Sequence, residues 1–159
     1  MKLLVLLAML ATVPAYAANE IVPNPVLTPG SFHNPPMPLR RLCAVGYTKT
    51  VRNVPLAVKR EVFRRYGYDL STTRMGDYEI DHVGSLELDG TNDISNLWPQ
   101  SYRTLPLNAY RKDVLEGALK RLVCAGRMPL QDAQREITTD WPSAYQRYVL
   151  GTIPELARR

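Results

Sequence analysis

The strand-forming pattern of this chain is confined to one short stretch, and it limits any β-sheet to a small element. Residues 78–83 alternate enough to predict a short strand. Residues 85–88 predict a second strand before a turn at residues 89–92. Because the flanking segments carry helical spacing, we expect an α+β fold in which a two-stranded β-element is embedded among helices.

Helices are predicted on both sides of this stretch. One covers about residues 55–66, with proline in its first turn and glycine as its stop, and another covers about residues 107–125. Two shorter helices are predicted at about residues 130–138 and around residues 145–148. The apolar residues at helical spacing in the 107–125 segment are Val114, Ala118, Leu119 and Leu122. We expect Trp98 and Trp141 to be core residues.

The N-terminus has the features of a secretory signal peptide over residues 1–17. Lys2 precedes an apolar run that ends near Val13, and a small-residue cleavage pattern, Ala-Tyr-Ala, occupies residues 15–17. A membrane anchor is the alternative, but the run is much shorter than the roughly 20 residues of a spanning helix. We therefore expect a secreted or periplasmic protein with no membrane contact after signal removal.

Proline dominates the next segment, residues 18–39, where six of the 22 residues are proline. This composition predicts an extended tether, in which His33 is a solvated residue. The folded domain is expected over residues 40–150, followed by a C-terminal tail at residues 151–159. A chain of this size fits one compact domain, and we expect a monomer.

The chain has two cysteines, Cys43 and Cys124. In an exported chain an even count favours one disulfide, with two buried thiols as the alternative. A cysteine hydrolase that uses Cys124 and His82 would need a free thiol, which the disulfide would remove.

The formal net charge is +5 and becomes +4 when the signal peptide, with Lys2, is removed. An excess of positive charge favours a polyanionic partner without proving one. The basic residues concentrate in two groups: Arg40, Arg41, Lys49, Arg52, Lys59, Arg60, Arg64 and Arg65, and then Arg103, Arg111, Lys112, Lys120 and Arg121.

The predicted strand carries an adjacent pair with hydrolytic potential, Asp81 and His82. Alone, such a pair is usually a surface or core feature. Phosphodiester hydrolysis, however, needs a base for water and a cation for developing charge. His82, with an ordinary pKa of about 6.5, suits a general base. Asp81 points to the opposite face of the strand and suits an oxygen ligand for a divalent ion.

The region around this pair resembles the HNH, or ββα-metal, nucleases, and more narrowly a group of small exported bacterial HNH-like proteins. The resemblance covers about residues 43–148. Its central motifs are Tyr78-Glu79-Ile80-Asp81-His82, Leu86-Glu87-Leu88-Asp89-Gly90, Asn92-Asp93-Ile94, Asn96-Leu97-Trp98-Pro99-Gln100 and Lys112-Asp113-Val114-Leu115-Glu116.

The resemblance implies roles for further residues. Asn96 would hold the catalytic histidine in place, against the alternative of a plain turn asparagine. Asn108 would complete the metal site from the following helix, although Tyr110 occupies that position if the alignment slips. Few oxygen ligands predict Mg²⁺ or Mn²⁺. Arg111 and Lys112 would contact phosphate, or would simply be solvated helix charges.

Together these features predict an exported, metal-dependent endonuclease that hydrolyses DNA with low sequence specificity, with RNA left open as a substrate. With His82 as base, the rate should rise with pH through roughly 6 to 7. The alternative is a non-catalytic exported module that binds nucleic acid or another polyanion on a degenerate HNH scaffold.

Overall fold

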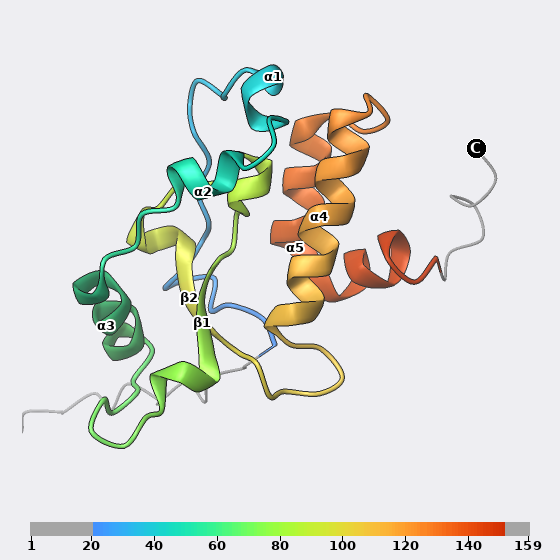
Figure 1. Cartoon of the computed structure of the whole chain (residues 1–159). Helices are drawn as coiled ribbons and strands as arrows, with labels where there is room; N and C mark the ends of the chain where they lie inside the picture. The colour runs from blue at the N-terminus through green and yellow to red at the C-terminus, as the bar shows by residue number, and fades with distance from the viewer. Residues whose placement is uncertain (1–20, 152–159) are drawn as a thin grey trace, which may run out of the picture.

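The computed structural model describes residues 21–151 and shows a mixed α/β arrangement around one small sheet (Figure 1). The predicted signal peptide and most of the predicted C-terminal tail lie outside the described residues. The sheet is a hairpin of β1 (Tyr78–His82) and β2 (Leu97–Ser101), which lies between α3 (Leu56–Arg65) and α4 (Ala109–Cys124). The α+β expectation is confirmed.

The two strands are antiparallel and pair residue by residue from Tyr78 with Ser101 to His82 with Leu97. The second strand was predicted in the wrong place. Residues Leu86–Leu88 form instead a 3₁₀ turn, η2, in which the Ser85 hydroxyl accepts a hydrogen bond from the Glu87 amide at 3.1 Å. Pro99 is tolerated inside β2 because a hairpin strand has only one neighbour to which its amides must donate.

The predicted helices are present to within a few residues. Pro55 caps α3, Gly67 follows it with a φ of +79°, and the apolar face of α3 buries Val62 and Phe63. The two C-terminal helices form one element, α5 (Leu130–Tyr148), which is kinked at Asp140 before Trp141 and Pro142. Two short helices, α1 (Leu39–Leu42) and α2 (Tyr47–Val51), were not predicted. The remaining 3₁₀ turns are η1 (Met75–Asp77) and η3 (Ile94–Asn96).

The main core lies between α4 and α5, which pack side by side, and η2 contacts both helices. Trp98 and Trp141 are both buried, as expected, whereas Val114 is 46% exposed because α4 turns Leu115 inward instead. The core residues are Leu88, Leu115, Leu119, Val123, Ala133, Ile137, Trp141, Ala144 and Tyr145.

The proline-rich segment is not a free tether over its described part, residues 21–39. The Trp141 indole donates to the Ile21 carbonyl at 2.7 Å, and the buried Thr28 hydroxyl donates to the Leu97 carbonyl at 3.2 Å. His33 was predicted to be solvated, but its Nδ1 lies 2.9 Å from the buried Asp89 carboxylate. The segment stays ordered because core groups satisfy its backbone and side-chain polar atoms.

Cys43 and Cys124 form the predicted disulfide and join the end of α1 to the end of α4, with their Cα atoms 5.7 Å apart. A free Cys124 nucleophile is therefore excluded, and with it the cysteine hydrolase. A disulfide is typical of an oxidising compartment. Among residues 21–151, no helix is long and apolar enough to cross a membrane.

Candidate functional site around Asp81 and His82

Asp81 and His82 end β1 and point to opposite faces of the hairpin, as strand geometry requires. Both side chains are almost fully buried, with exposures of 5% for Asp81 and 2% for His82. Asp81 faces α4, where it meets Lys112. His82 faces the loop between the strands, where it meets Asn92.

The His82 imidazole is oriented by Asn92, a residue that the sequence placed in a turn and in a motif shared with HNH nucleases but to which it assigned no role. Nε2 of His82 lies 3.2 Å from Oδ1 of Asn92. That oxygen also accepts from the Asn53 amide, and the Asn92 amide nitrogen donates to the Val51 carbonyl. Because Asn92 Oδ1 is an acceptor, Nε2 carries the proton of neutral His82, and Nδ1 keeps the lone pair.

Burial is the main influence on the protonation of His82. It lowers the pKa to about 4, although Asp81 and the Asn92 hydrogen bond act in the opposite direction. The imidazole is therefore neutral at physiological pH, as a general base must be. The expected rise in rate between pH 6 and 7 does not follow from this environment, because His82 is already deprotonated there.

Lys112 does not face solvent, so its predicted contact with phosphate is wrong. The side chain is 2% exposed, and its ammonium lies 2.8 Å from Oδ2 of Asp81 and 2.6 Å from Oε1 of Glu116. It also donates to the His82 carbonyl at 2.8 Å. Burial lowers the pKa of Lys112, but the two carboxylates outweigh burial and raise it above its ordinary value, so the ammonium stays charged.

Asn96 is fully buried and organises the loop that follows β1. Its amide group binds both backbone polar atoms of Gly84, donates to the Thr91 carbonyl and accepts from the Ser31 amide. All these partners are backbone groups, so Asn96 does not hold the His82 ring directly as the resemblance implied. It fixes the loop on which Asn92, the partner of His82, is carried.

Asn108 is the N-cap of α4 and not a free ligand. Its side-chain oxygen accepts from the Arg111 amide at 3.3 Å, and its amide nitrogen donates to the Tyr102 carbonyl at 3.1 Å. Tyr110 is exposed and stacks on the Tyr102 ring. Arg111 is exposed, and its guanidinium also reaches the Tyr145 hydroxyl at 3.4 Å, so its phosphate contact stays a prediction.

The arrangement does not fit a divalent ion held between Asp81 and Asn108. One Asp81 oxygen accepts from the His82 amide at 2.7 Å, and the other, which accepts no hydrogen bond, lies 2.8 Å from the Lys112 ammonium. The oxygen of Asn108 serves the cap, and its amide nitrogen donates to the Tyr102 carbonyl. Within the described part of the chain, no group of three or more His, Cys, Asp or Glu side chains is placed to hold a metal ion.

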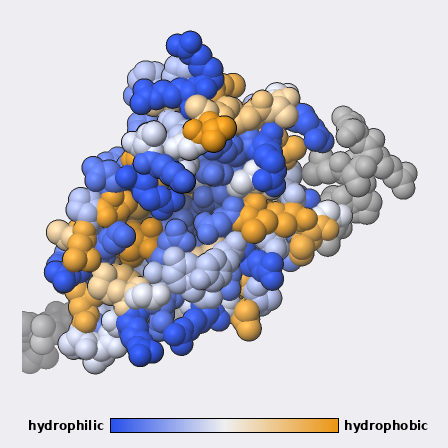
Figure 2. Space-filling view, viewed as in Figure 1, coloured by the Kyte–Doolittle hydropathy of each residue, from blue (hydrophilic) through white to orange (hydrophobic). Residues whose placement is uncertain are grey.

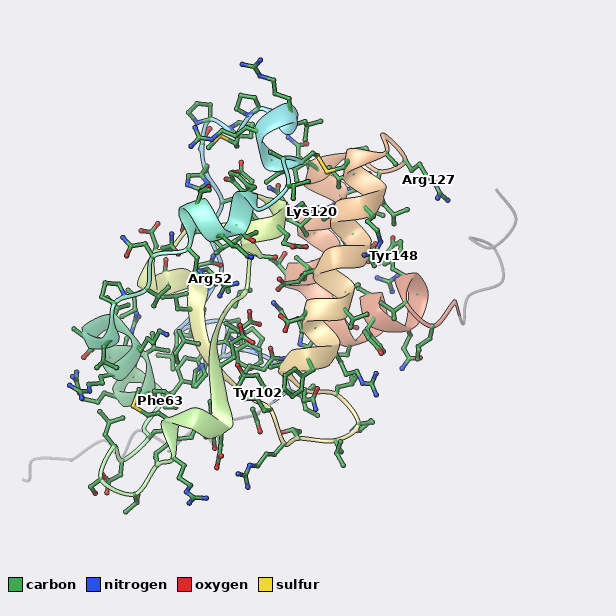
Figure 3. The ribbon with its side chains drawn as sticks, in the orientation of Figure 1. Arg52, Phe63, Tyr102, Lys120, Arg127 and Tyr148 are labelled. Carbon is green, nitrogen blue, oxygen red and sulfur yellow. A yellow bond between two sulfur atoms is a disulfide. The ribbon has the colours of Figure 1, made fainter. Side chains whose placement is uncertain are left out.

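A polar cavity of about 340 Å³ lies beside β1 and is lined from both faces of the strand, by Glu79 from the Asp81 face and by Tyr78 and Ile80 from the other, while His82 itself does not line it. Arg52, Lys59 and Tyr102 also line it. Hydrophilic side chains also gather in the hollowed middle of the molecular face seen in Figure 2. Figure 3 places Arg52 beside the hairpin and Tyr102 near the start of α4.

Glu79 is the carboxylate of this cavity. It lies 3.8 Å from the Arg52 guanidinium and accepts from the Tyr102 hydroxyl at 3.4 Å. Burial, followed by repulsion from Asp81 and other carboxylates, raises its pKa to about 7. Glu79 is thus partly protonated near neutral pH, while His82 is neutral.

No family model, curated protein or solved structure matches this chain.

Proposed function

We propose that this chain is an exported nuclease that binds DNA at the cavity beside β1 and hydrolyses phosphodiester bonds with His82 as general base. The observation that carries the proposal is the cavity beside β1, the strand that ends in His82, whose lining includes the cations Arg52 and Lys59. A neutral, oriented imidazole next to exposed cations is what base-assisted attack on a phosphodiester requires.

The order of elements supports an HNH-like identity for this site. A strand that ends in His82, an ordered loop, a second antiparallel strand and a helix follow one another along the chain and pack together. Asn96 stabilises the loop of this unit through its backbone contacts. The unit has the ββα order that the resemblance implies.

Binding would depend on the exposed cations of the cavity rather than on Lys112. Arg52 is half exposed, with 50% of its side chain in contact with solvent, and Lys59 is exposed. Phosphate contacts of this kind fix a nucleic acid without reading its sequence and weaken as salt concentration rises. The proposed substrate is therefore DNA of any sequence, with RNA as the comparison in the assay.

In the proposed reaction, His82 takes a proton from a water molecule whose oxygen attacks phosphorus, and the bond from phosphorus to one sugar oxygen breaks. The leaving oxygen takes a proton from water, and Arg52 balances the charge on the phosphoryl group. Because His82 is 2% exposed, the groups that cover its ring must move before water reaches the lone pair of Nδ1.

The test is cleavage of plasmid DNA and of RNA by the mature protein, each with a chelator and with added Mg²⁺ or Mn²⁺. We expect His82→Ala to abolish cleavage without loss of binding, and Arg52→Ala to weaken both. Arg127→Ala is the matched control, because Arg127 is an exposed cation beyond the end of α4, away from Arg52 (Figure 3). Cleavage that is equal in wild type and His82→Ala would reject the mechanism.

A second candidate is a non-catalytic module that binds nucleic acid or another polyanion. The burial of His82 beneath Asn92 favours it, because a closed imidazole cannot reach a substrate. Salt-sensitive binding that depends on Arg52, together with no cleavage of either nucleic acid under any ion condition, would select this candidate over the nuclease.

Export is part of the same proposal. It is supported by the signal-peptide pattern at residues 1–17 and by the disulfide, which needs an oxidising compartment to persist. Fractionation of cells that express the full chain, followed by mass determination of the product, should show a protein that begins at Ala18 outside the cytoplasm.

A further inference from the structure

The contact between α4 and the β-hairpin is built around a buried ammonium group. Lys112 reaches from the second turn of α4 to the end of β1, where its three oxygen partners belong to Asp81, Glu116 and the His82 backbone. These three distances are between 2.6 and 2.8 Å. Side chains from this part of α4 and from β1 approach each other in Figure 3.

The ammonium donates hydrogen bonds to Oε1 of Glu116 and to the His82 carbonyl, whereas Oδ2 of Asp81 lies 2.8 Å away as an ion-pair partner that accepts no hydrogen bond. A lysine ammonium has three N–H donors and no acceptor, and three oxygens surround it. Its single positive charge faces two carboxylates that are themselves buried. A buried charge is tolerated only when it is paired. The Lys112 ammonium therefore stays between its two carboxylate partners, because leaving them would expose each buried charge without a partner.

We propose that the Lys112 ammonium is a built-in cation that takes the place of a divalent metal ion at Asp81. The Asp81 carboxylate is the group predicted to ligate Mg²⁺ or Mn²⁺, and it is already paired with the Lys112 ammonium. The organisation of the hairpin against α4 therefore needs no metal. This inference does not depend on the proposed nuclease activity, because it concerns the cation that Asp81 binds.

A second consequence concerns what happens when the ammonium is removed. Lys112→Ala leaves Asp81 and Glu116 as two buried carboxylates with no cation between them. Hard divalent ions prefer oxygen ligands of this type, and the truncated side chain leaves space beside them. The variant is expected to be destabilised and to gain a binding site for Mn²⁺ that wild-type protein lacks.

The experiment measures Mn²⁺ binding to the mature protein by electron paramagnetic resonance, together with the midpoint of thermal unfolding in a chelator and in added Mn²⁺. Wild type should not bind Mn²⁺ at Asp81, so Asp81→Asn should bind Mn²⁺ no more weakly than wild type. Added Mn²⁺ should not change the unfolding midpoint of wild type. Lys112→Ala should bind Mn²⁺ at least tenfold more tightly than wild type, and Mn²⁺ should raise its midpoint by several degrees. Lys120→Ala, on the same helix, is the control and should behave like wild type.

One result overturns the proposal directly: stoichiometric Mn²⁺ binding by wild type that Asp81→Asn abolishes. If Lys112→Ala does not fold, a double-mutant cycle with Asp81→Asn and Lys112→Met replaces it. The unfolding midpoint of the double variant should then fall by less than the sum of the decreases in the two single variants, because the double variant leaves neither charge without its partner. Additive losses would contradict the proposed pairing.

Discussion

The side chain of Asn96 binds both backbone polar groups of Gly84: its oxygen accepts the Gly84 amide at 2.7 Å, and its amide nitrogen donates to the Gly84 carbonyl at 2.9 Å. Gly84 lies two residues after His82, so this contact holds the first turn of the loop that leaves β1. A buried asparagine with this arrangement replaces a backbone partner that the irregular loop cannot supply.

Asn96→Ala should therefore destabilise the protein strongly. Several buried backbone groups lose their partner at once, and each unsatisfied group costs about 1–3 kcal/mol. We expect a loss of at least about 3 kcal/mol in the free energy of unfolding, measured by urea denaturation. Asn53→Ala, at an exposed position, is the control and should change it by less than about 0.5 kcal/mol.

Asn108→Ala distinguishes a helix cap from a metal ligand. Loss of the cap should cost about 1 kcal/mol of unfolding free energy. Asn108→Asp keeps the acceptor at the N-terminus of α4 and should stay close to wild type in the same measurement. If Asn108→Ala instead has the stability of wild type but binds Mn²⁺ with a different affinity, the ligand role is supported.

Asn92→Ala should expose the His82 imidazole to solvent. Removal of the Asn92 side chain takes away the group that lies against Nε2 of His82 and its links to Val51 and Asn53. Diethyl pyrocarbonate modifies neutral imidazoles that solvent can reach, so His82 should react in the variant and be protected in wild type. His33, with 42% of its side chain exposed, serves as the internal standard in peptide mapping. Equal protection of His82 in both proteins would show that Asn92 is not the cover.

Glu79→Gln should change the pH dependence of stability. Burial raises the folded-state pKa of Glu79 to about 7, above its ordinary value near 4.5. Its contribution is therefore fully present below about pH 4.5 and is lost as pH rises through 7. Because glutamine carries no charge, the variant should be more stable than wild type at pH 8, by about 1–2 kcal/mol after allowance for partial exposure. This advantage should disappear near pH 4.5; an advantage of equal size at both pH values would point to packing instead.

Loss of the disulfide should be costly because it closes a long loop. Cys43 and Cys124 are 81 residues apart, and the chain-entropy relation gives about 4 kcal/mol for a loop of that size. Cys43→Ser/Cys124→Ser should show this loss in urea denaturation, and reduced wild type should match it. A loss well below 2 kcal/mol would indicate that the unfolded chain is already compact.

The local patterns of the sequence were sufficient for much of the framework. Proline and glycine at the ends of α3, helical periodicity in α4 and alternation in β1 depend on neighbouring residues only, and these elements lie where they were predicted. The pairing of two cysteines followed from their number. The location of β2 did not follow, because a segment that contains Pro99 has a weak strand signal until its partner strand is known.

Only the tertiary structure decided how the site is assembled. A lysine at position 112 has the same local signature whether it faces solvent or Asp81, because the helix spacing says nothing about what lies opposite. The roles of Asn92 and of the proline-rich segment likewise depend on hydrogen bonds between residues far apart in the chain. Sequence by itself singled out Asp81 and His82 as the candidates for chemistry. The packing of α4 against β1 decided that Asp81 would be paired with an ammonium, and the loop that carries Asn92 covers His82, since burial and pairing are set by distant segments.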